Sequence, residues 1–431
     1  MHPTNVKAKG IEFNLEALRG ACAFFVVIYH VVLHKQYVDP EFFPRWMKAF
    51  NISGHFCVLI FFVLSGYVIG ISNPGRLSAG KIVPYLKKRF IRIYPIYFIC
   101  LTIALLFAIP YSAKIIAANY TMLQGLVGPV VWENNPLWSL NYEIVYYLLF
   151  IPLSFFNVRP VVALIGAVAI GLINYLLFPA IYTPIVSAYS YGFAFWATGW
   201  CMAAYLKERE TALSPQKLLS GMFLLLSQPF IIVFYYPFKL ISKLAHNPLH
   251  YPDVVYWAEN MVTLDDFAMI PYCILLVTLF SGIRFKYKKQ LFAFLYLIPI
   301  ISLALLLKKN HDLESIGANL LPIICYILSL ALYFGPENLF ENASRKLINV
   351  GFWLGSVSYG LYVIHFPIMV IFGKVGVFSG STITFIIRLF AFIATCLVAA
   401  YILEKRIQPW VGGKLRNILL PSSGNAASKT K

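Results

Sequence analysis

Apolar runs, each long enough to cross a membrane, alternate with short polar connections along most of this chain. A helix needs roughly 20 apolar residues to span the hydrocarbon core of a bilayer. We therefore predict an all-α fold, a polytopic bundle of transmembrane helices with about twelve spans, or ten if one weak pair between 207 and 350 does not span. The twelve predicted spans are residues 15–34, 54–72, 92–110, 137–156, 160–178, 190–206, 217–237, 264–282, 290–307, 318–335, 353–373 and 382–403.

The composition of the chain agrees with this interpretation. Of its 431 residues, 60% are hydrophobic and 12% are charged, whereas soluble domains carry roughly 25% charged residues. No polar stretch is long enough to form a separate soluble domain. Residues 1–410 are therefore predicted to form one transmembrane domain, and the polar residues 411–431 are predicted to form a disordered tail.

The net charge of +18 does not indicate a nucleic-acid partner, because the basic residues are spread over many short connections instead of forming one patch. An excess of Lys and Arg in some connections is the pattern that orients membrane proteins, with the basic connections in the cytoplasm. The strongest case is GRLSAGKIVPYLKKRFIR at 75–92, which has six basic residues and no acidic one. This segment and both chain termini are therefore predicted to be cytoplasmic.

Arg19 and His30 are ionisable side chains within the first apolar run, NLEALRGACAFFVVIYHVVLH. Eleven positions apart on an α-helix, they share one face and stand about 16 Å apart along the helix axis. Ionisable groups at membrane depth are costly, so the pair is a candidate site. Each residue also has a structural alternative, in which Arg19 extends to the membrane surface as an anchor, and His30 lies near the opposite interface or bonds to its own helix.

A second pair, Arg89 and Arg92 in KKRFIRIYP, lies one turn apart on one helix face. Membrane orientation alone explains positive charge here. It does not require guanidinium groups, which bind phosphate through two parallel hydrogen bonds. The pair is therefore a candidate site for a cytoplasmic ligand that carries a pyrophosphate.

An acidic residue, Glu143, lies within the fourth predicted span, in PLWSLNYEIVYYLLF. In the predicted topology it lies at a depth similar to that of His30, where a carboxylate would orient the imidazole and raise its basicity. The alternative is a purely structural pairing with another helix. Ser139, one turn earlier, is a candidate for binding an acceptor molecule, with a hydrogen bond to its own helix as the alternative.

The eleventh predicted span carries SYGLYVIH, in which Tyr362 and His365 stand among apolar residues. Aromatic side chains at helical spacing are more often core packing than chemistry. An imidazole at membrane depth is nevertheless a candidate for substrate binding. The seven cysteines stand singly, without metal-ligand spacing, and we expect no metal.

Five stretches, in this order, resemble the membrane-bound acyltransferase-3 family, which O-acylates bacterial surface glycans, antibiotics and signalling lipo-oligosaccharides. LEALRGACAFFVVIYH is similar to the family's first-helix motif, with its R-x10-H pair at Arg19 and His30. The other four are FFVLSGYVI, KKRFIRIYPIY with the family's RxxR, PLWSLNYEIVYYLLF and LGSVSYGLYVIHFPI. The chain departs from the family at Glu404, which Lys405 and Arg406 follow where the family often has Glu-x-Pro. It is similar to the stand-alone form of the family, without an esterase-like SGNH domain.

The resemblance implies roles for the candidate residues. These are catalytic His30, Arg19 and Glu143, CoA-binding Arg89 and Arg92, and acceptor-binding Ser139, Tyr362 and His365. His30 would be the base that activates the acceptor hydroxyl, or a nucleophile that carries the acyl group transiently. Both mechanisms remain open at this point.

From these observations we expect an integral membrane O-acyltransferase of the bacterial cytoplasmic (inner) membrane. It would move an acyl group, foremost acetyl, from cytoplasmic acetyl-CoA to a hydroxyl of an extracytoplasmic or lipid-linked glycan. Its partners would be the acyl-CoA donor, a glycan or glycolipid acceptor and membrane lipids. The same intramembrane charges are also compatible with a glycan or lipid transporter or flippase, or with an acyl-CoA sensor without turnover.

Overall fold

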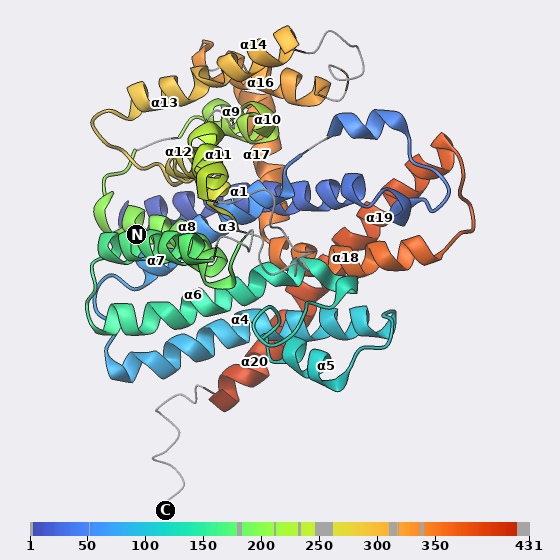
Figure 1. The fold of residues 1–431 in the computed structure, drawn as a ribbon, viewed down its shortest axis with the longest axis horizontal. Helices are drawn as coiled ribbons and strands as arrows, with labels where there is room; N and C mark the ends of the chain where they lie inside the picture. The colour runs from blue at the N-terminus through green and yellow to red at the C-terminus, as the bar shows by residue number, and fades with distance from the viewer. Residues whose placement is uncertain are drawn as a thin grey trace, which may run out of the picture.

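The computed structural model of this chain is a bundle of helices (Figure 1). It describes residues 3–50, 52–178, 183–210, 213–231, 234–245, 262–309, 317, 319–336 and 340–419, and these ranges contain no β-strand. The helices are α1 (Pro3–Leu33), α2 (Lys35–Val38), η1 (Arg45–Phe50), α3 (Gly54–Ser72), α4 (Ala79–Leu106), α5 (Ala113–Tyr120), η2 (Trp132–Leu137), α6 (Trp138–Phe155), α7 (Pro160–Leu177), α8 (Ile185–Tyr205), α9 (Pro215–Leu226), α10 (Gln228–Ile231), α11 (Tyr235–Ala245), η4 (Leu264–Met269), α12 (Ile270–Ser281), α13 (Lys288–Leu297), α14 (Pro299–Lys309), α16 (Leu320–Phe334), α17 (Glu341–Gly355), α18 (Ser358–Lys374), α19 (Thr382–Ile402), the π-helix η5 (Leu403–Ile407) and α20 (Gln408–Leu419).

Local sequence explains where several of these helices begin and end. The side chain of Ser53 accepts a hydrogen bond from the backbone N–H of Phe56 and so starts α3. Ser381 and Thr384 form a reciprocal cap at the start of α19. Gly282 ends α12 with a φ of 66°, a left-handed conformation that glycine adopts without strain.

Each of the twelve predicted spans overlaps at least one helix, so the helical nature of the apolar runs is confirmed. Among the described residues, however, seven helices are long and apolar enough to cross a membrane, or eight if the bent pair α17–α18 forms one span. The predicted count of twelve spans is therefore not confirmed. One reason is length: α16 has 15 residues, which at ~1.5 Å each fall short of a ~30 Å hydrocarbon core.

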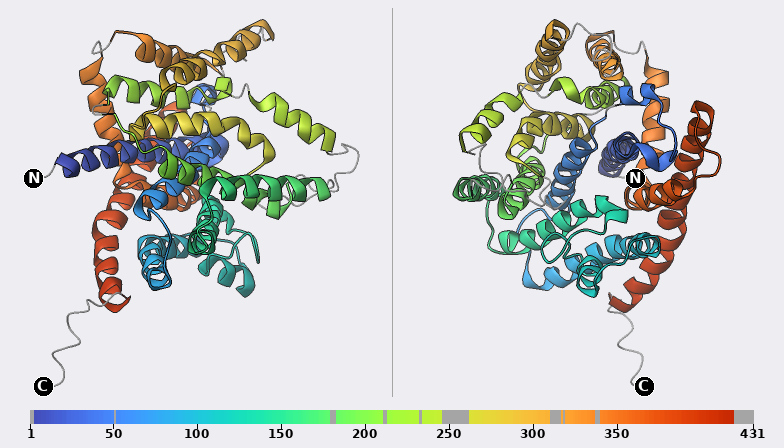
Figure 2. Two further views of the ribbon diagram at one scale, coloured as in Figure 1. Left: turned by 90° about the vertical axis from the view of Figure 1, so that its left-hand side faces the viewer. Right: turned by 45° about the vertical axis from the view of Figure 1, so that its right-hand side comes forward.

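The C-terminal helices form one long arm along the edge of the bundle. Figure 2 shows α19, η5 and α20 following one another down this edge. The helical run continues to Leu419, so the predicted tail, 411–431, begins within α20. Residues 420–431 of that tail lie outside the described residues.

Glycines allow the central helices to approach each other closely. A Cβ atom on Gly66 of α3 would lie 1.8 Å from the carbonyl oxygen of Trp196 in α8. A Cβ atom on Gly355 of α17 would lie 2.0 Å from the carbonyl oxygen of Glu16 in α1. Small residues at such contacts are typical of membrane helix packing, because they let backbones meet. These contacts position α1 and α3, which both carry site residues.

A sharp bend separates α17 from α18. The two helices meet at 72°. As Figure 1 shows, α17 crosses α1 steeply, while α18 lies beside α1 and also contacts α4 and η2. The bend therefore brings the SYGLYVIH segment of α18 next to the helix that carries Arg19 and His30.

A buried cluster ties the chain after α1 to the α18–α19 connection. Asp39 is fully buried and accepts hydrogen bonds from Ser379, from the backbone N–H of Gly380 and from Thr384. Nearby, the buried Arg388 of α19 donates four hydrogen bonds to backbone carbonyl groups, including that of Val38 at 2.6 Å. Arg388 thus has no acidic partner among the described residues, and its hydrogen bonds hold the α18–α19 connection to the end of α2.

The close approach of α1 and α17 can be tested with Gly355→Ala. The added Cβ would overlap the carbonyl oxygen of Glu16, and overpacking of this kind costs about 1–3 kcal/mol. We expect a lower melting temperature for the purified protein in detergent. The matched control is Gly166→Ala in α7, where a Cβ would meet nothing within 4 Å. The control should be neutral or stabilising, since alanine favours helix, and an unchanged melting temperature for Gly355→Ala would contradict this packing.

Asp39 should make stability depend on pH. Burial raises the pKa of its carboxyl group, but hydrogen bonds from Ser379, Gly380, Thr384 and Glu41 outweigh burial and lower that pKa. Because the folded-state pKa lies below the unfolded value of about 3.9, the carboxylate stabilises the fold above that value, and the stabilisation is lost as pH falls through the folded pKa. The difference in melting temperature between wild type and Asp39→Asn should therefore shrink below about pH 4. A difference that stays constant from neutral to acidic pH would argue against this role.

Candidate functional site

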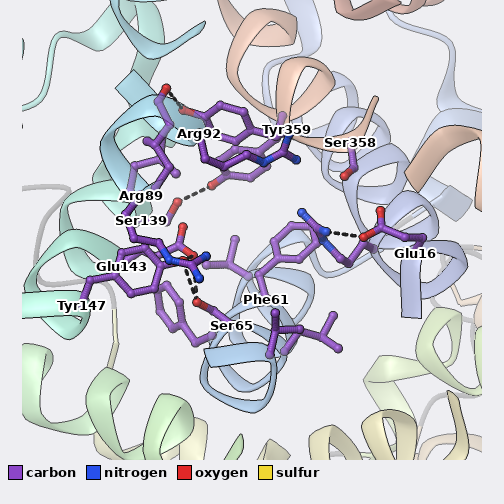
Figure 3. A pocket seen from close by; sticks show the side chains of 18 residues that line it. Glu16, Phe61, Ser65, Arg89, Arg92, Ser139, Glu143, Tyr147, Ser358 and Tyr359 are labelled. Atoms are coloured by element: carbon purple, nitrogen blue, oxygen red, sulfur yellow. Dashed lines mark hydrogen bonds and ion pairs between the residues drawn. The ribbon is translucent and has the colours of Figure 1, made fainter. Parts of the chain in front are cut away.

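One cavity of about 430 Å³ brings together six of the eight predicted site residues (Figure 3). These six are Arg19, Arg89, Arg92, Ser139, Glu143 and Tyr362. They come from α1, α4, α6 and α18, with Phe61 and Ser65 of α3 completing the wall. Segments from both ends of the chain therefore contribute to one site. We call this region the arginine end.

Two arginines of the cavity form ion pairs. Arg19 is paired with Glu16, one turn earlier in α1, at 2.5 Å between Nη1 and Oε1. Arg92 is paired with the buried Glu404 at 3.2 Å, and Glu404 also accepts a hydrogen bond from the backbone N–H of Gly360. Glu404 lies on the π-helix η5, a local distortion that is frequent at functional sites. Sequence analysis noted Glu404 as a departure from the family but did not place it near Arg92.

The third arginine, Arg89, lies over two aromatic rings. Its guanidinium carbon is 5.8 Å from the ring centroid of Tyr85 and 5.5 Å from that of Tyr147. Its buried Nε has no hydrogen-bond partner among the described residues. Buried hydrogen-bond donors usually have a partner. A charged donor without a partner is free to donate a hydrogen bond to an anionic ligand.

Glu143 lies at the arginine end, and the predicted pairing with His30 is wrong. Its carboxylate accepts hydrogen bonds from Ser65 at 2.9 Å and from Tyr147, one turn later in α6. Tyr147 could have been found from its i+4 spacing to Glu143. Ser65 could not, because it reaches Glu143 from α3 only in the folded bundle.

The depth at which α6 begins explains this error. The prediction placed the start of the fourth span at the membrane interface, but η2 precedes α6 within the bundle. At the start of η2, the ring of Trp132 lies 5.7 Å from that of His34 at the end of α1. From there the chain passes through η2, which is kinked, into α6, and Glu143 lines the same cavity as Arg19, whereas His30 does not line it. Glu143 therefore lies near Arg19 and not beside His30.

Ser139 and Tyr362 hydrogen-bond to each other, with 2.7 Å between their hydroxyl oxygens. Both hydroxyls also lie 3.1 Å from the carbonyl oxygen of Pro136. On its other side, the ring centroid of Tyr362 is 6.1 Å from that of His365. Tyr362 thus stands between the cavity and the two histidines.

His30 and His365 form a pair that does not line the cavity. Nε2 of His365 lies 3.0 Å from Nδ1 of His30. His365 is fully buried and His30 is partly buried. The rings of Tyr29 and Phe366 flank His30, with centroids 5.1 and 5.3 Å from its own. We call this region the histidine end; the eight predicted residues therefore divide between two regions that Tyr362 connects.

An aromatic cluster continues from the histidine end toward the surface. It consists of His34, Tyr37, Trp132 and Phe366, with ring centroids 5.2–6.5 Å apart. Trp132 is 47% exposed and donates a hydrogen bond from Nε1 to the hydroxyl of Tyr37 at 3.2 Å. Sequence analysis did not identify this cluster, because its members come from three separate helices and the chain between them.

A larger cleft of about 900 Å³ lies next to the arginine end and shares Arg92 with the cavity. Its lining includes Lys88, Lys405 and Arg416. Gln408 also lines it, and the buried Oε1 of this amide has no hydrogen-bond partner among the described residues. Sequence analysis missed the cleft because it assigned Arg416 to a disordered tail.

Comparisons with known proteins agree with the motifs in the first part of the chain. A family model described as "Acyltransferase domain" matches residues 12–306. A curated relative, "Protein 2 in picA locus" of Rhizobium radiobacter, is 28% identical over 170 residues, which are 39% of this chain and 78% of the relative. No solved structure matches this chain. The family match includes Arg19, His30, Arg89, Arg92 and Glu143, and it ends before α18.

Proposed function

The chain belongs to the acyltransferase-3 family, whose model matches well over half of it, and from this membership we propose that it is an O-acyltransferase that uses acetyl-CoA and acylates a glycan hydroxyl. It is a helical protein with several membrane-crossing helices. One observation supports the proposal most directly. Three arginines and Tyr362 line one cavity, and the ring of Tyr362 also lies beside the histidine pair. The acetyl group, the CoA thioester and the glycan acceptor are parts of the proposal.

The arginine end suits the donor. Arg89 and Arg92 lie one turn apart on α4, and both line the cavity. Their guanidinium groups can therefore bind the same pyrophosphate group. The adjoining basic cleft, with Lys88, Lys405 and Arg416, offers further positive charge for the nucleotide part of CoA. We place this end in the cytoplasm, where CoA thioesters occur, in agreement with the basic segment 75–92. Both termini would then be cytoplasmic, and the membrane would be the bacterial inner membrane.

The histidine end suits the acceptor. It lies near the C-terminal end of α1, about 16 Å along the helix from Arg19, which lies in the middle of α1. The cluster of His34, Tyr37, Trp132 and Phe366 presents aromatic faces beside His30, and aromatic faces pack well against the apolar faces of sugar rings. We therefore propose a glycan or glycolipid acceptor that reaches His30 from the extracytoplasmic side.

In the proposed reaction, His30 removes the proton of the acceptor hydroxyl, and the hydroxyl oxygen attacks the carbonyl carbon of the thioester. The C–S bond breaks, and the CoA thiolate leaves and takes up a proton from His30, giving an ester and free CoA thiol. Arg19 offsets negative charge that develops near the thioester. Glu143 is not the partner of His30 in this mechanism. It accepts hydrogen bonds from Ser65 and Tyr147, and its negative charge balances the positive charge of the arginines.

The donor site is tested by replacing both arginines of the RxxR pair. Arg89→Ala with Arg92→Ala should weaken acetyl-CoA binding at least tenfold, because each charge-assisted hydrogen bond contributes about 1.5–3 kcal/mol. Calorimetry on purified protein measures the affinity. The variant with lysine at both positions keeps the positive charge but loses the paired hydrogen bonds of guanidinium, so it should bind acetyl-CoA with intermediate affinity. Arg159→Ala, at an exposed site before α7, is the control, and unchanged affinity in the double alanine variant would remove this pair from the donor site.

The chemistry is tested with His30→Ala and Arg19→Ala. Each should abolish release of CoA thiol in the presence of a glycan acceptor, while the protein stays in the membrane and elutes as wild type. Normal acylation of surface glycan in a His30→Ala strain would contradict the mechanism. Substrate movement by the wild-type protein without thioester turnover would instead support a flippase. Mass spectrometry of surface polysaccharide from a deletion strain would identify the acyl group.

A further inference from the structure

Each imidazole of the histidine pair faces a backbone carbonyl with its Nδ1 atom. Nδ1 of His365 lies 3.2 Å from the carbonyl oxygen of Leu361, one turn earlier in α18. Nδ1 of His30 lies 3.0 Å from the carbonyl oxygen of Val26, one turn earlier in α1. A carbonyl oxygen only accepts hydrogen bonds, so both Nδ1 atoms must carry hydrogen to bond there.

The contact between the two rings adds a second constraint. Nε2 of His365 lies 3.0 Å from Nδ1 of His30, so one of these two nitrogens must donate to the other. If Nε2 of His365 donated, Nδ1 of His30 would have to give up its hydrogen and its bond to Val26, and His365, with hydrogen on both nitrogens, would be a cation. His365 is fully buried, and no carboxylate among the described residues forms an ion pair with either ring. An unpaired buried charge is costly, so the neutral arrangement is favoured: Nε2 of His365 accepts, and the single Nδ1–H of His30 is shared between that nitrogen and the carbonyl oxygen of Val26.

This arrangement leaves one nitrogen of the pair with an unshared electron pair. With hydrogen on Nδ1, the Nε2 atom of His30 is unprotonated, and it has no hydrogen-bond partner among the described residues. Tyr29, His34 and Phe366 surround the ring. The basic atom of the pair is therefore on His30, the residue nearer the aromatic cluster.

We propose that His365 is a positioning residue that holds His30 in the tautomer with hydrogen on Nδ1, so that Nε2 of His30 is the atom that removes the acceptor's proton. The catalytic step rests on the proposed function, whereas the tautomer is a property of the resting protein. This role replaces the sequence-based assignment of His365 to acceptor binding. It also replaces Glu143 as the partner of His30, with a neutral imidazole in place of a carboxylate.

The tautomer is tested directly by nuclear magnetic resonance on the full-length protein with labelled histidine. The chain has eight histidines, and the signal of His30 is identified by its loss in His30→Gln. The proposal requires hydrogen on Nδ1 of His30 at neutral pH in the wild-type protein. Hydrogen on Nε2 instead would overturn it. This measurement does not depend on enzymatic turnover, so it decides the arrangement even if acetyl-CoA proves not to be the donor.

The role of His365 is tested by comparing two replacements. His365→Gln can place a carbonyl oxygen near the former Nε2 and still accept from His30, whereas His365→Phe keeps a ring but has no acceptor. We expect kcat to fall about tenfold or more in His365→Phe, because part of the ~10²–10⁴-fold contribution of general-base catalysis would be lost, and to be largely retained in His365→Gln. The affinity for acetyl-CoA should be unchanged in both, because His365 does not line the cavity.

Met369→Leu is the matched control, since Met369 is buried one turn later on α18 and lines no part of the cavity. It should keep the wild-type kcat. Equal losses in His365→Gln and His365→Phe would show that only the shape of the ring matters and would overturn the proposal. So would wild-type kcat in His365→Phe. If the wild-type protein binds no CoA thioester, the proposed function is contradicted. The tautomer of His30 is then decided by nuclear magnetic resonance alone.

Discussion

A charged side chain inside an apolar helix bundle is costly unless another group compensates for it, and the architecture of this protein follows from that constraint. Arg19 is compensated within its own helix by Glu16, whereas Arg92 is compensated by Glu404 on η5. The second pair joins α4 to η5, far apart in the sequence, and Arg92 of this pair lines the cavity. Charge compensation thus holds η5 beside the arginine end. Arg89, with an unpaired Nε among the described residues, is the position where we propose that a phosphate binds.

Small residues let the helices that carry the site approach each other closely. Gly355 lets α17 touch α1, and Gly66 lets α3 touch α8. The 72° bend after Gly355 then turns α18 alongside α1. Because α18 carries both Tyr362 and His365, one bend places one residue in the cavity wall and the other against His30.

In our proposal, the two substrates enter the site from opposite ends, which would account for its length. In our proposal the donor's phosphates stay at the arginine end, and the pantetheine arm carries the thioester toward the histidine end. Tyr362 and Ser139, hydrogen-bonded to each other, stand between the two regions. In this proposal, the separation of Arg19 and His30 by about three helical turns would span the distance between a cytoplasmic donor and an extracytoplasmic acceptor.

Sequence alone determined the helical class, the positions of the apolar runs and most of the candidate residues, because helical periodicity and the cost of intramembrane charge act locally along the chain. It also placed Arg19 and His30 on one face. It did not determine the depth of Glu143, which depends on η2 packing inside the bundle, nor the partner of His30, which comes from α18. These relations join segments far apart in the sequence, so no local pattern specifies them. Only the tertiary structure decided that the histidine faces another histidine and that the carboxylate belongs with the arginines.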